Sequence, residues 1–273
     1  MHLIDFSRKP LIMGVVNITP DSFSDGGKFF SVDKALTQAR VLVDEGVDIL
    51  DIGGESTRPG SVSVDVDEEL KRIFPILEVL VRENVPVSVD TSKPEVMRHV
   101  IAAGAAMIND VNALRAPGAL EAVAASKSVA VCMMHMQGKP SNMQENPQYA
   151  NIIHEVMAFL DDRIQTAVAH GIARDRIIID PGFGFGKTLQ HNLLLLKELK
   201  QFSRLCVPVL AGISRKSMLG TITGNPADQR VHESVAAAML AVINGADIVR
   251  VHDVKATSDA LAIYHAVQEA DAK

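Results

Sequence analysis

The sequence contains no tryptophan, only two tyrosines and only two cysteines among its 273 residues. With so few large aromatic side chains, the hydrophobic core has to be built mainly from aliphatic residues. The cysteines, Cys132 and Cys206, both lie in apolar, strand-like segments. We therefore expect two reduced thiols in the core, as is usual for proteins of the cytosol, and no disulfide scaffold.

Long hydrophobic runs and an excess of positive charge are also missing. The longest unbroken apolar run is nine residues, at positions 235–243, whereas a membrane-spanning helix needs about 20. The first residues show no small-residue cleavage site of a signal peptide. The net charge is −6, which argues against a nucleic-acid surface. We expect a cytoplasmic protein that binds neither membrane nor nucleic acid.

Short apolar runs recur along the whole chain, and each is followed by a polar cluster. These runs are rich in valine and isoleucine and do not alternate with polar residues, which is typical of strands buried on both faces. Eight such strands are predicted, at residues 11–17, 47–53, 85–90, 105–110, 128–135, 176–181, 207–214 and 247–253.

Amphipathic patterns between the apolar runs predict helices, among them residues 32–44, 67–82, 94–102, 150–169 and 228–243. Several are followed by a glycine that would end the helix, namely Gly46, Gly104, Gly171 and Gly245. Eight strand–helix units in 273 residues give about 34 residues per unit, which predicts one (β/α)8 TIM barrel as a single domain over residues 1–273. The alternative is a doubly wound open sheet, which would want a glycine-rich turn after its first strand.

Every predicted strand ends in a polar or charged group. In a TIM barrel these ends meet at one rim and build the active site, although polar residues are also ordinary in solvated loops. The groups concerned are Asn17, residues 55–58, Asp90, residues 109–110, His135, Asp180, residues 214–216 and residues 250–252.

The cationic members of this set indicate an anionic ligand. Arginine offers a planar fork of donors that fits phosphate oxygens, so the cluster favours a phosphate or diphosphate. Asn17 could bind Mg²⁺ weakly, sharing it with that phosphate. The cations are Arg58, Lys216, Arg250 and His252.

Asp90, Asn109 and Asp180 form a second, hydrogen-bonding group on the third, fourth and sixth predicted strands. Carboxylate and amide groups suit a flat heterocycle with an amino-oxo edge. Metal binding is the alternative, but the spacing does not match a tight all-protein metal site.

Two long connections, residues 19–27 and 53–60, follow the first and second predicted strands. They combine glycines, hydroxyl groups and a phenylalanine or proline. This composition fits mobile lids over an active site and equally fits ordinary flexible loops.

At these positions the chain resembles the dihydropteroate synthase family, and the resemblance extends over all eight strand ends in order. The matching stretches are NITPDSFSDGG (17–27), GGESTRPG (53–60), VDT (89–91), IND (108–110), MHMQG (134–138), DPGFGFGK (180–187), GISRKS (212–217) and RVHD (250–253). The resemblance implies joining of (7,8-dihydropterin-6-yl)methyl diphosphate to 4-aminobenzoate in a dissociative substitution. It also implies Mg²⁺ as cofactor, a homodimer and inhibition by sulfonamides.

The resemblance further implies three groups of site residues. The pterin would be held by Asp90, Asn109, Asp180 and Lys216, with Met134 packed beside it and Arg250 stacked on its face. The diphosphate would be held by Asn17 through Mg²⁺ and by Arg58, Arg250 and His252. The 4-aminobenzoate would be enclosed by Phe23, Pro59, Phe185, Lys216 and Ser217, and the substrate contacts also include Thr57 and Gly212.

Among these residues we assign catalytic roles to Asn17, Arg58, Asp90, Lys216, Arg250 and His252. Two other classes of protein stay open at this point. A pterin-binding methyltransferase domain would share the barrel and the acids but would have no use for Arg58 or for residues 214–217. A non-catalytic pterin-binding barrel would be expected to have lost a diphosphate-binding cation or part of a lid.

Overall fold

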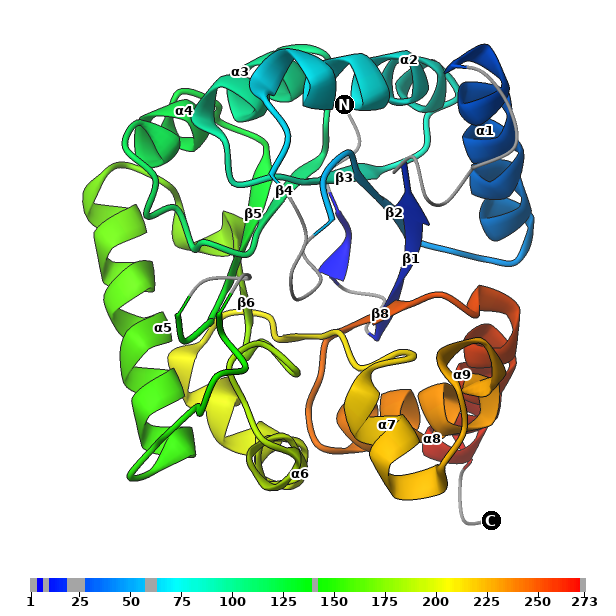
Figure 1. Cartoon of the computed structure of the whole chain (residues 1–273), viewed down its shortest axis with the longest axis vertical. Helices are drawn as coiled ribbons and strands as arrows, with labels where there is room; N and C mark the ends of the chain where they lie inside the picture. Colours follow the sequence, from blue (N-terminus) through cyan, green and yellow to red (C-terminus); the bar gives the residue numbers. More distant parts are fainter. Residues whose placement is uncertain (1–3, 7–9, 19–27, 57–62, 139–141, 271–273) are drawn as a thin grey trace.

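Eight parallel strands form the centre of the fold (Figure 1). The computed structural model describes residues 4–6, 10–18, 28–56, 63–138 and 142–270. Each strand lies within one of the predicted apolar runs. The strands are β1 (Leu11–Asn17), β2 (Ile49–Gly53), β3 (Val87–Asp90), β4 (Met107–Asp110), β5 (Ala130–Met134), β6 (Ile177–Asp180), β7 (Leu210–Ala211) and β8 (Ile248–Val251).

The strands follow the order β6-β5-β4-β3-β2-β1-β8-β7, and contacts between β6 and the segment before β7 close this sheet into a ring. Ile179 forms a parallel bridge with Val209, and its backbone N–H donates to the carbonyl oxygen of Pro208 at 3.0 Å. The TIM-barrel prediction is therefore confirmed, and the alternative of an open doubly wound sheet is wrong.

Helices cover the outside of the barrel between successive strands (Figure 1). The five helices whose ranges were given above are present, most of them with slightly shifted ends, and α4, α6, α7 and α9 add further helices to the repeating strand–helix pattern. The helices are α1 (Lys28–Asp44), α2 (Val66–Arg82), α3 (Pro94–Ala102), α4 (Ala119–Ala124), α5 (Ile152–Ala169), α6 (Leu189–Lys197), α7 (Ser217–Thr223), α8 (Val231–Ile243) and α9 (Val254–Gln268), with short 3-10 helices η3 (Arg174–Arg176), η4 (Leu199–Leu205) and η5 (Ala227–Gln229).

The four glycines predicted to end helices all adopt the left-handed backbone conformation that glycine tolerates best. The φ angles are 92° at Gly46, 101° at Gly104, 90° at Gly171 and 99° at Gly245. The glycine signal in the sequence therefore has a direct conformational cause at all four positions.

The buried apolar residues divide into a large outer core and a small inner one. The outer core lies between the strands and the surrounding helices and includes Ile52, Leu77 and Val131. The inner core fills the lower part of the barrel interior, at the amino-terminal side of the strands. It consists of Leu11, Met13, Ile49, Met107, Ala130, Cys132, Ile178, Leu210 and Ile248.

The two cysteines differ in their surroundings. Cys132 is a free thiol in the inner core, as predicted. The prediction for Cys206 is wrong, because this residue is exposed and follows η4 with a left-handed φ of 53°. Cys206 was predicted to be buried because it directly precedes the apolar run at residues 207–214. Only Leu210–Ala211 of that run forms a strand.

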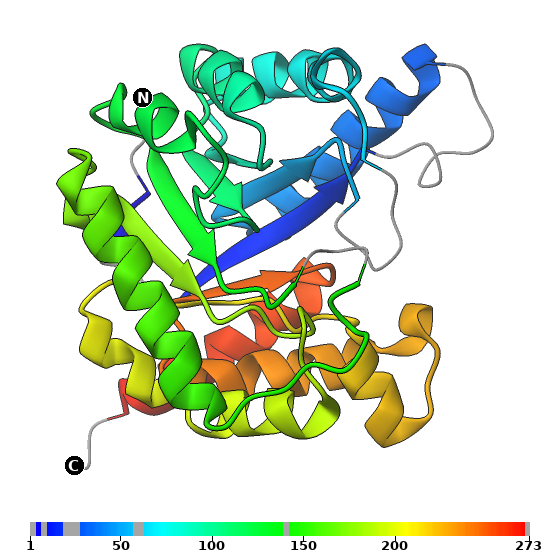
Figure 2. The same cartoon turned by 60° about the vertical axis from the view of Figure 1, so that its left-hand side comes forward.

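All eight strands point toward the same rim, where their carboxyl ends and the connections that follow are gathered (Figure 2). This is the rim where TIM barrels place their active sites. Among the described residues, no helix combines the length and the apolar character that a membrane crossing requires.

Candidate active site

The upper part of the barrel interior is lined by polar side chains that project from alternate residues of the strands. The even-numbered strands contribute Asp51, Asn109, Asp180 and Arg250, each of them two residues beyond an apolar inner-core residue of the same strand. Because side chains on a strand alternate between its two faces, residues two apart point to the same side. The site is therefore a continuation of the inner core in which polar and charged side chains replace the apolar ones.

Arg250 belongs to this polar layer and is held by two acidic side chains, Asp51 and Asp90. Its Nε donates to Asp51 Oδ2 at 2.6 Å, and its Nη2 lies 3.3 Å from Asp90 Oδ2. Asn109 Nδ2 donates to the same Asp51 oxygen at 3.3 Å. These contacts fix the plane of the guanidinium group, which is the property that an arginine needs for stacking on a ring or clamping a phosphate.

The ion pairs also determine the charge of Arg250. Burial alone would lower the pKa of the guanidinium, but the neighbouring acidic side chains, chiefly the Asp51 carboxylate, outweigh this effect and raise it. Arg250 therefore keeps its positive charge inside the barrel.

Asp51 was missed by the sequence analysis, which considered only the residues at the strand ends. The side chain is fully buried, and its Oδ1 has no hydrogen-bond partner among the described residues. A signal for it exists in the sequence. A carboxylate within a strand that is buried on both faces has no apolar packing role, and Asp51 lies two residues before the strand-end residue Gly53.

Asp90 has an unusual protonation equilibrium. Burial, together with the nearby negative charge of Asp51, raises the pKa of this carboxyl group to about 8, although Arg250 acts in the opposite direction. At neutral pH the Asp90 carboxyl is therefore mainly protonated and is able to donate a hydrogen bond.

Asp180 and Lys216 form a second group on the opposite side of the barrel mouth. Burial raises the pKa of Asp180, and the positive charge of Lys216 opposes this shift. Burial lowers the pKa of Lys216 to about 8, and Asp180 opposes that shift in turn. The Asp180 carboxylate also accepts a hydrogen bond from the backbone N–H of Gly182 at 2.7 Å, which fixes its orientation.

The Lys216 ammonium group is held against the connection that follows β6. It donates to the carbonyl oxygen of Phe183 and lies 4.6 Å from the centre of the Phe185 ring. Ser217 is the exposed first residue of α7, immediately beside Lys216. The structure thus brings three of the predicted substrate contacts, Phe185, Lys216 and Ser217, to one side of the barrel mouth.

A small apolar cluster borders this group. Met134, at the end of β5, packs with Val111, Met136 and Met143, and the ring of Phe185 packs against the cluster. Only Met134 and Phe185 were predicted as site residues. Val111 follows directly after the strand-end pair Asn109 and Asp110, so its position in the sequence was the available signal.

Asn17, His252 and Gly212 occupy the remaining strand ends. Asn17 is paired with Gly53 across β1 and β2, and Gly53 is paired with Asp90 across β2 and β3. The ring of His252 lies 3.1 Å from Ser214 Oγ, measured from Nδ1. A Cβ atom on Gly212 would lie 3.8 Å from Arg250 Cβ, so this residue adjoins the central arginine.

Four predicted site residues, Phe23, Thr57, Arg58 and Pro59, lie outside the described residues. The strand-end residue His135 does lie within them, but it does not face the polar layer. Its ring is buried against Phe159 and close to Tyr149. Among the described residues, no group of three or more histidine, cysteine or acidic side chains could hold a metal ion.

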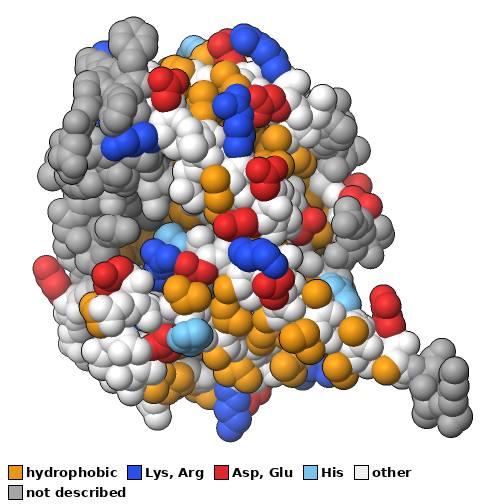
Figure 3. Space-filling view, turned by 90° about the vertical axis from the view of Figure 1, so that its right-hand side faces the viewer, with side chains coloured by type: hydrophobic (Ala, Val, Ile, Leu, Met, Phe, Trp, Pro, Cys, Tyr) orange, Lys and Arg blue, Asp and Glu red, His pale blue; other side chains and the backbone are white. Residues whose placement is uncertain are grey.

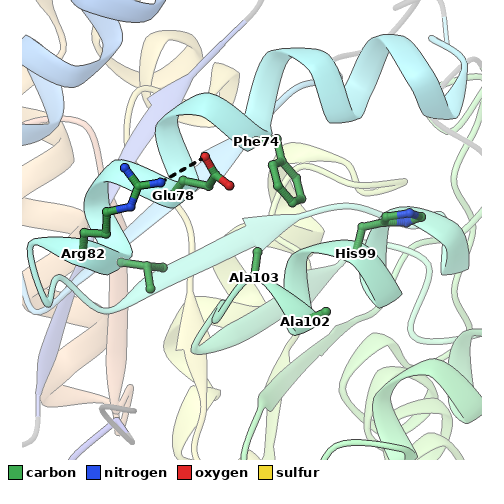
Figure 4. A pocket seen from close by; sticks show the side chains of 7 residues that line it. Phe74, Glu78, Arg82, His99, Ala102 and Ala103 are labelled. Atoms are coloured by element: carbon green, nitrogen blue, oxygen red, sulfur yellow. Dashed lines mark hydrogen bonds and ion pairs between the residues drawn. The ribbon is translucent and has the colours of Figure 1, made fainter.

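A groove of about 370 Å³ lies elsewhere, on the outer surface between α2 and α3. Figure 4 shows Phe74 and His99 beside it and Glu78 paired with Arg82 at 3.4 Å. The groove includes none of the strand-end side chains, so it is separate from the candidate active site.

A closed barrel whose carboxyl-terminal rim carries a polar interior layer, cationic side chains and an apolar cluster has the arrangement typical of a TIM-barrel enzyme. The sequence pattern of the family "pterin binding enzyme" matches residues 13–252. The chain is 50% identical to the dihydropteroate synthase of Haemophilus influenzae, over 96% of this chain and 95% of that protein.

Solved structures agree with this relationship. A dihydropteroate synthase of Yersinia pestis with a sulfonamide drug superposes with a TM-score of 0.92 at 47% identity, covering 97% of this chain and 96% of that chain. The Xanthomonas albilineans dihydropteroate synthase with 4-aminobenzoic acid superposes with a TM-score of 0.91 at 52% identity, covering 97% and 95%. The chain belongs to the pterin binding enzymes and, within them, to the dihydropteroate synthase family of transferases.

Proposed function

We propose that this chain joins (7,8-dihydropterin-6-yl)methyl diphosphate to 4-aminobenzoate, which yields 7,8-dihydropteroate and diphosphate. The observation that carries the proposal is the combination of two kinds of side chain at the barrel mouth. The acidic and amide side chains suit the amino-oxo edge of a pterin, and the cations Arg250 and Lys216 suit the negative charge of a diphosphate and of a carboxylate. The family relationship supports the same reaction.

In this proposal the pterin enters the polar layer. Asn109 and Asp180 offer a carboxamide and a carboxylate to the ring edge, and the protonated carboxyl of Asp90 offers a donor. Met134 provides an apolar surface beside the ring. The plane of the Arg250 guanidinium, fixed by Asp51, would stack on the ring face.

The diphosphate group would lie over the end of β1 and β8, held by Arg250, His252 and Arg58. Asn17 fits a Mg²⁺ ion that is shared with the diphosphate, because Mg²⁺ commonly takes only one or two protein oxygens and completes its shell with phosphate oxygens and water. When bound, the ion would neutralise charge on the leaving diphosphate.

The reaction then needs few protein groups. The bond between the methylene carbon and the diphosphate oxygen breaks, and its electron pair leaves with the diphosphate. The neutral amine nitrogen of 4-aminobenzoate forms the new bond to the methylene carbon, and one amine proton passes to water or to the departing diphosphate. The fixed cations favour the departure because they stabilise the developing negative charge. No nucleophile–base pair is required.

The 4-aminobenzoate would lie against Phe185 and Lys216, with Ser217, Phe23, Thr57 and Pro59 completing its pocket. A sulfonamide resembles this substrate, so it should compete at the same place, and the Yersinia pestis relative is known in complex with a sulfonamide drug. Competition kinetics with 4-aminobenzoate as the varied substrate would measure this directly.

A turnover assay with both substrates and Mg²⁺ tests the proposed function. Formation of 7,8-dihydropteroate and diphosphate in equal amounts is the expected result. A methyltransferase domain or a non-catalytic pterin-binding barrel would bind the pterin but release no diphosphate. Removal of the metal with a chelator should slow the reaction, and unchanged turnover would contradict the role given to Asn17.

We also propose that the chain forms a homodimer through α8 and α9. Figure 3 shows hydrophobic side chains gathered over the lower part of one face of the molecule. The large hydrophobic side chains exposed on these two helices are Leu240, Ile243, Ile263 and Val267. Exposed apolar patches commonly mark protein interfaces. Sedimentation should give a dimer for the native chain and a monomer for Ile243→Glu, and a native monomer would contradict the proposal.

A further inference from the structure

A buried lysine lies beneath the connection between β6 and α6. Lys187 is only 3% exposed. Its Nζ donates to the carbonyl oxygen of Phe185 at 2.9 Å, lies 3.0 Å from His135 Nδ1, and makes a longer contact of 3.4 Å with the His135 carbonyl oxygen. Among the described residues it forms no ion pair. Lysine is seldom buried in this way without a carboxylate partner, so its three contacts need an explanation.

The connection above Lys187, residues 181–188, packs backbone against backbone on the segment that follows β5, residues 135–138. Gly182 and Gly186 have left-handed φ angles of 72° and 62°. A Cβ atom at Gly182 would lie 1.9 Å from the carbonyl oxygen of His135, and one at Gly186 would lie 2.6 Å from that of Gln137. Only glycine allows so close an approach of two backbone segments.

Side chains from neighbouring elements also hold the backbone of this connection. Tyr149 Oη donates to the carbonyl oxygen of Gly186 at 2.8 Å. Asn192 Oδ1 accepts from the backbone N–H of Gly184 at 2.7 Å. The connection therefore has one defined shape, and Lys187 and Asn192 both support it from buried positions.

Phe185 links this support to the active site. Its carbonyl oxygen accepts from Lys187, while its ring lies between the Met134 cluster and the ammonium group of Lys216. Any shift of the Phe185 backbone would therefore move a wall of the proposed 4-aminobenzoate pocket.

We propose that Lys187 is a positioning residue that holds the Phe185 ring in place as the wall against which 4-aminobenzoate binds. Lys187 does not touch the substrate in this scheme. The inference rests on the proposed function, because Phe185 has this task only if 4-aminobenzoate is a substrate.

The pKa values of His135 and Lys187 are consistent with a Lys187 amino group that always donates to the Phe185 carbonyl oxygen. Burial lowers the pKa of His135 to about 3, so its ring stays neutral under physiological conditions. Burial also lowers the pKa of Lys187 to about 7, with Asp180 raising it and Lys216 lowering it further. A lysine amino group carries at least two N–H donors in either protonation state, so the bond to Phe185 can persist when the proton is lost.

Lys187→Met tests the proposal because it keeps most of the apolar stem and removes the donors. We expect the KM for 4-aminobenzoate to rise roughly 10- to 100-fold, the range that displaced pocket contacts produce. The dissociation constant of the pterin substrate should change much less than this KM, because Lys187 acts on the pterin-binding residue Asp180 only through its charge. Lys197→Met, an exposed lysine on the following helix α6, is the matched control and should leave both constants unchanged.

A double-mutant cycle separates positioning from a general loss of structure. Phe185→Ala should itself raise the KM for 4-aminobenzoate. If Lys187 acts through Phe185, adding Lys187→Met to Phe185→Ala should raise that KM no further. Fully additive effects would overturn the proposal.

Lys187→Met leaves buried carbonyl groups without a donor and could fail to fold. Tyr149→Phe is the second variant, because it removes one hydrogen bond to the same connection from a half-buried position. It should raise the KM for 4-aminobenzoate in the same direction by a smaller factor, and faster hydrogen exchange at the Gly184 and Phe185 amides should accompany the rise.

Faster exchange with an unchanged KM, in either variant, would overturn the proposal. Failure of the proposed function would be seen differently, as absence of 7,8-dihydropteroate with the unmodified chain.

Discussion

The lower and upper parts of the barrel interior are lined by the same strands and differ completely in chemistry. On β2, β4, β6 and β8 an apolar side chain is followed two residues later by a polar one. These pairs are Ile49 and Asp51, Met107 and Asn109, Ile178 and Asp180, and Ile248 and Arg250. Two residues along a strand correspond to roughly 7 Å. On each of these strands, the residue that stabilises the fold and the residue that faces the ligand are therefore only two positions apart.

The two parts make opposite contributions to the free energy of unfolding. Burial of each large apolar side chain in the lower part stabilises the fold by roughly 1.5–3 kcal/mol. In the upper part burial raises the pKa values of Asp90 and Asp180, which means that their charged forms are disfavoured in the folded protein. The upper part is thus held in place by the rest of the barrel, and substitutions in the two parts should have different consequences.

The largest effect is expected in the lower part. Ile178→Ala removes a fully buried side chain from the inner core and should lower the free energy of unfolding by about 2–5 kcal/mol, because a cavity remains. Chemical denaturation would measure the loss, and calorimetry at a temperature where the variant is folded should show normal pterin affinity. A large loss of affinity in the folded variant would show that the two parts are not separable.

At Asp180, two residues further along the same strand, a substitution should weaken ligand binding and leave the stability of the fold intact. Asp180→Asn replaces a carboxylate oxygen with an amide donor where the pterin edge needs an acceptor, and the mispairing should cost about 1–3 kcal/mol of binding free energy or more. The fold should not weaken, because the pKa of Asp180 is raised by burial and the neutral amide avoids that penalty. Unchanged pterin affinity in calorimetry would remove Asp180 as the anchor of the ring.

The fold could be predicted from the sequence because its signals are local and repeated. The apolar run at residues 11–17 coincides with β1, and the pattern at residues 94–102 coincides with α3. Helices such as α4, with only six residues, are too short to show a clear period. The strand at residues 207–214 was predicted too long, since closure of the barrel at Ile179 and Val209 depends on a distant partner and not on local composition.

The site could be predicted only as far as its residues lie at strand ends or in the quoted motifs. Asp90, Asn109 and Arg250 were found in this way. The structure joins Asn109 to Arg250 through Asp51, a residue that was not found, and Arg250 contacts Asp90 directly. Lys187 was quoted within a motif, but its burial beneath Phe185 depends on how two loops pack. Contacts of this kind link residues far apart in the sequence, which no local pattern encodes.

Protonation provides a third comparison, since the inner core, as far as the structure describes it, is made of apolar side chains and Asp90 belongs to the polar layer above it. The folded protein keeps the Asp90 proton up to a pH of about 8, whereas an unfolded chain releases it near pH 4. Between these values the unfolded state binds fewer protons, so the contribution of Asp90 to stability falls as the pH rises. Denaturation at pH 5.5 and 8.5 should show a decrease in the native chain that is smaller in Asp90→Asn by at least about 1 kcal/mol.

Equal pH dependence in the native chain and in Asp90→Asn would show that this carboxyl is ionised in the folded protein. In that case Asp90 could accept hydrogen bonds from the pterin but could not donate one.

The smallest effect is expected at Ser88, where the two parts of the interior meet. Ser88 is paired with Asp51 across β2 and β3 and with Met107 across β3 and β4. It is fully buried, and its hydroxyl has no hydrogen-bond partner among the described residues. Because an unpaired buried hydroxyl is destabilising, Ser88→Ala should raise the free energy of unfolding by up to about 1 kcal/mol without changing pterin affinity. A loss of stability in denaturation experiments would mean that the hydroxyl has a partner, and a water shared with the equally unpaired Asp51 Oδ1 would then extend the polar layer one residue deeper into the barrel.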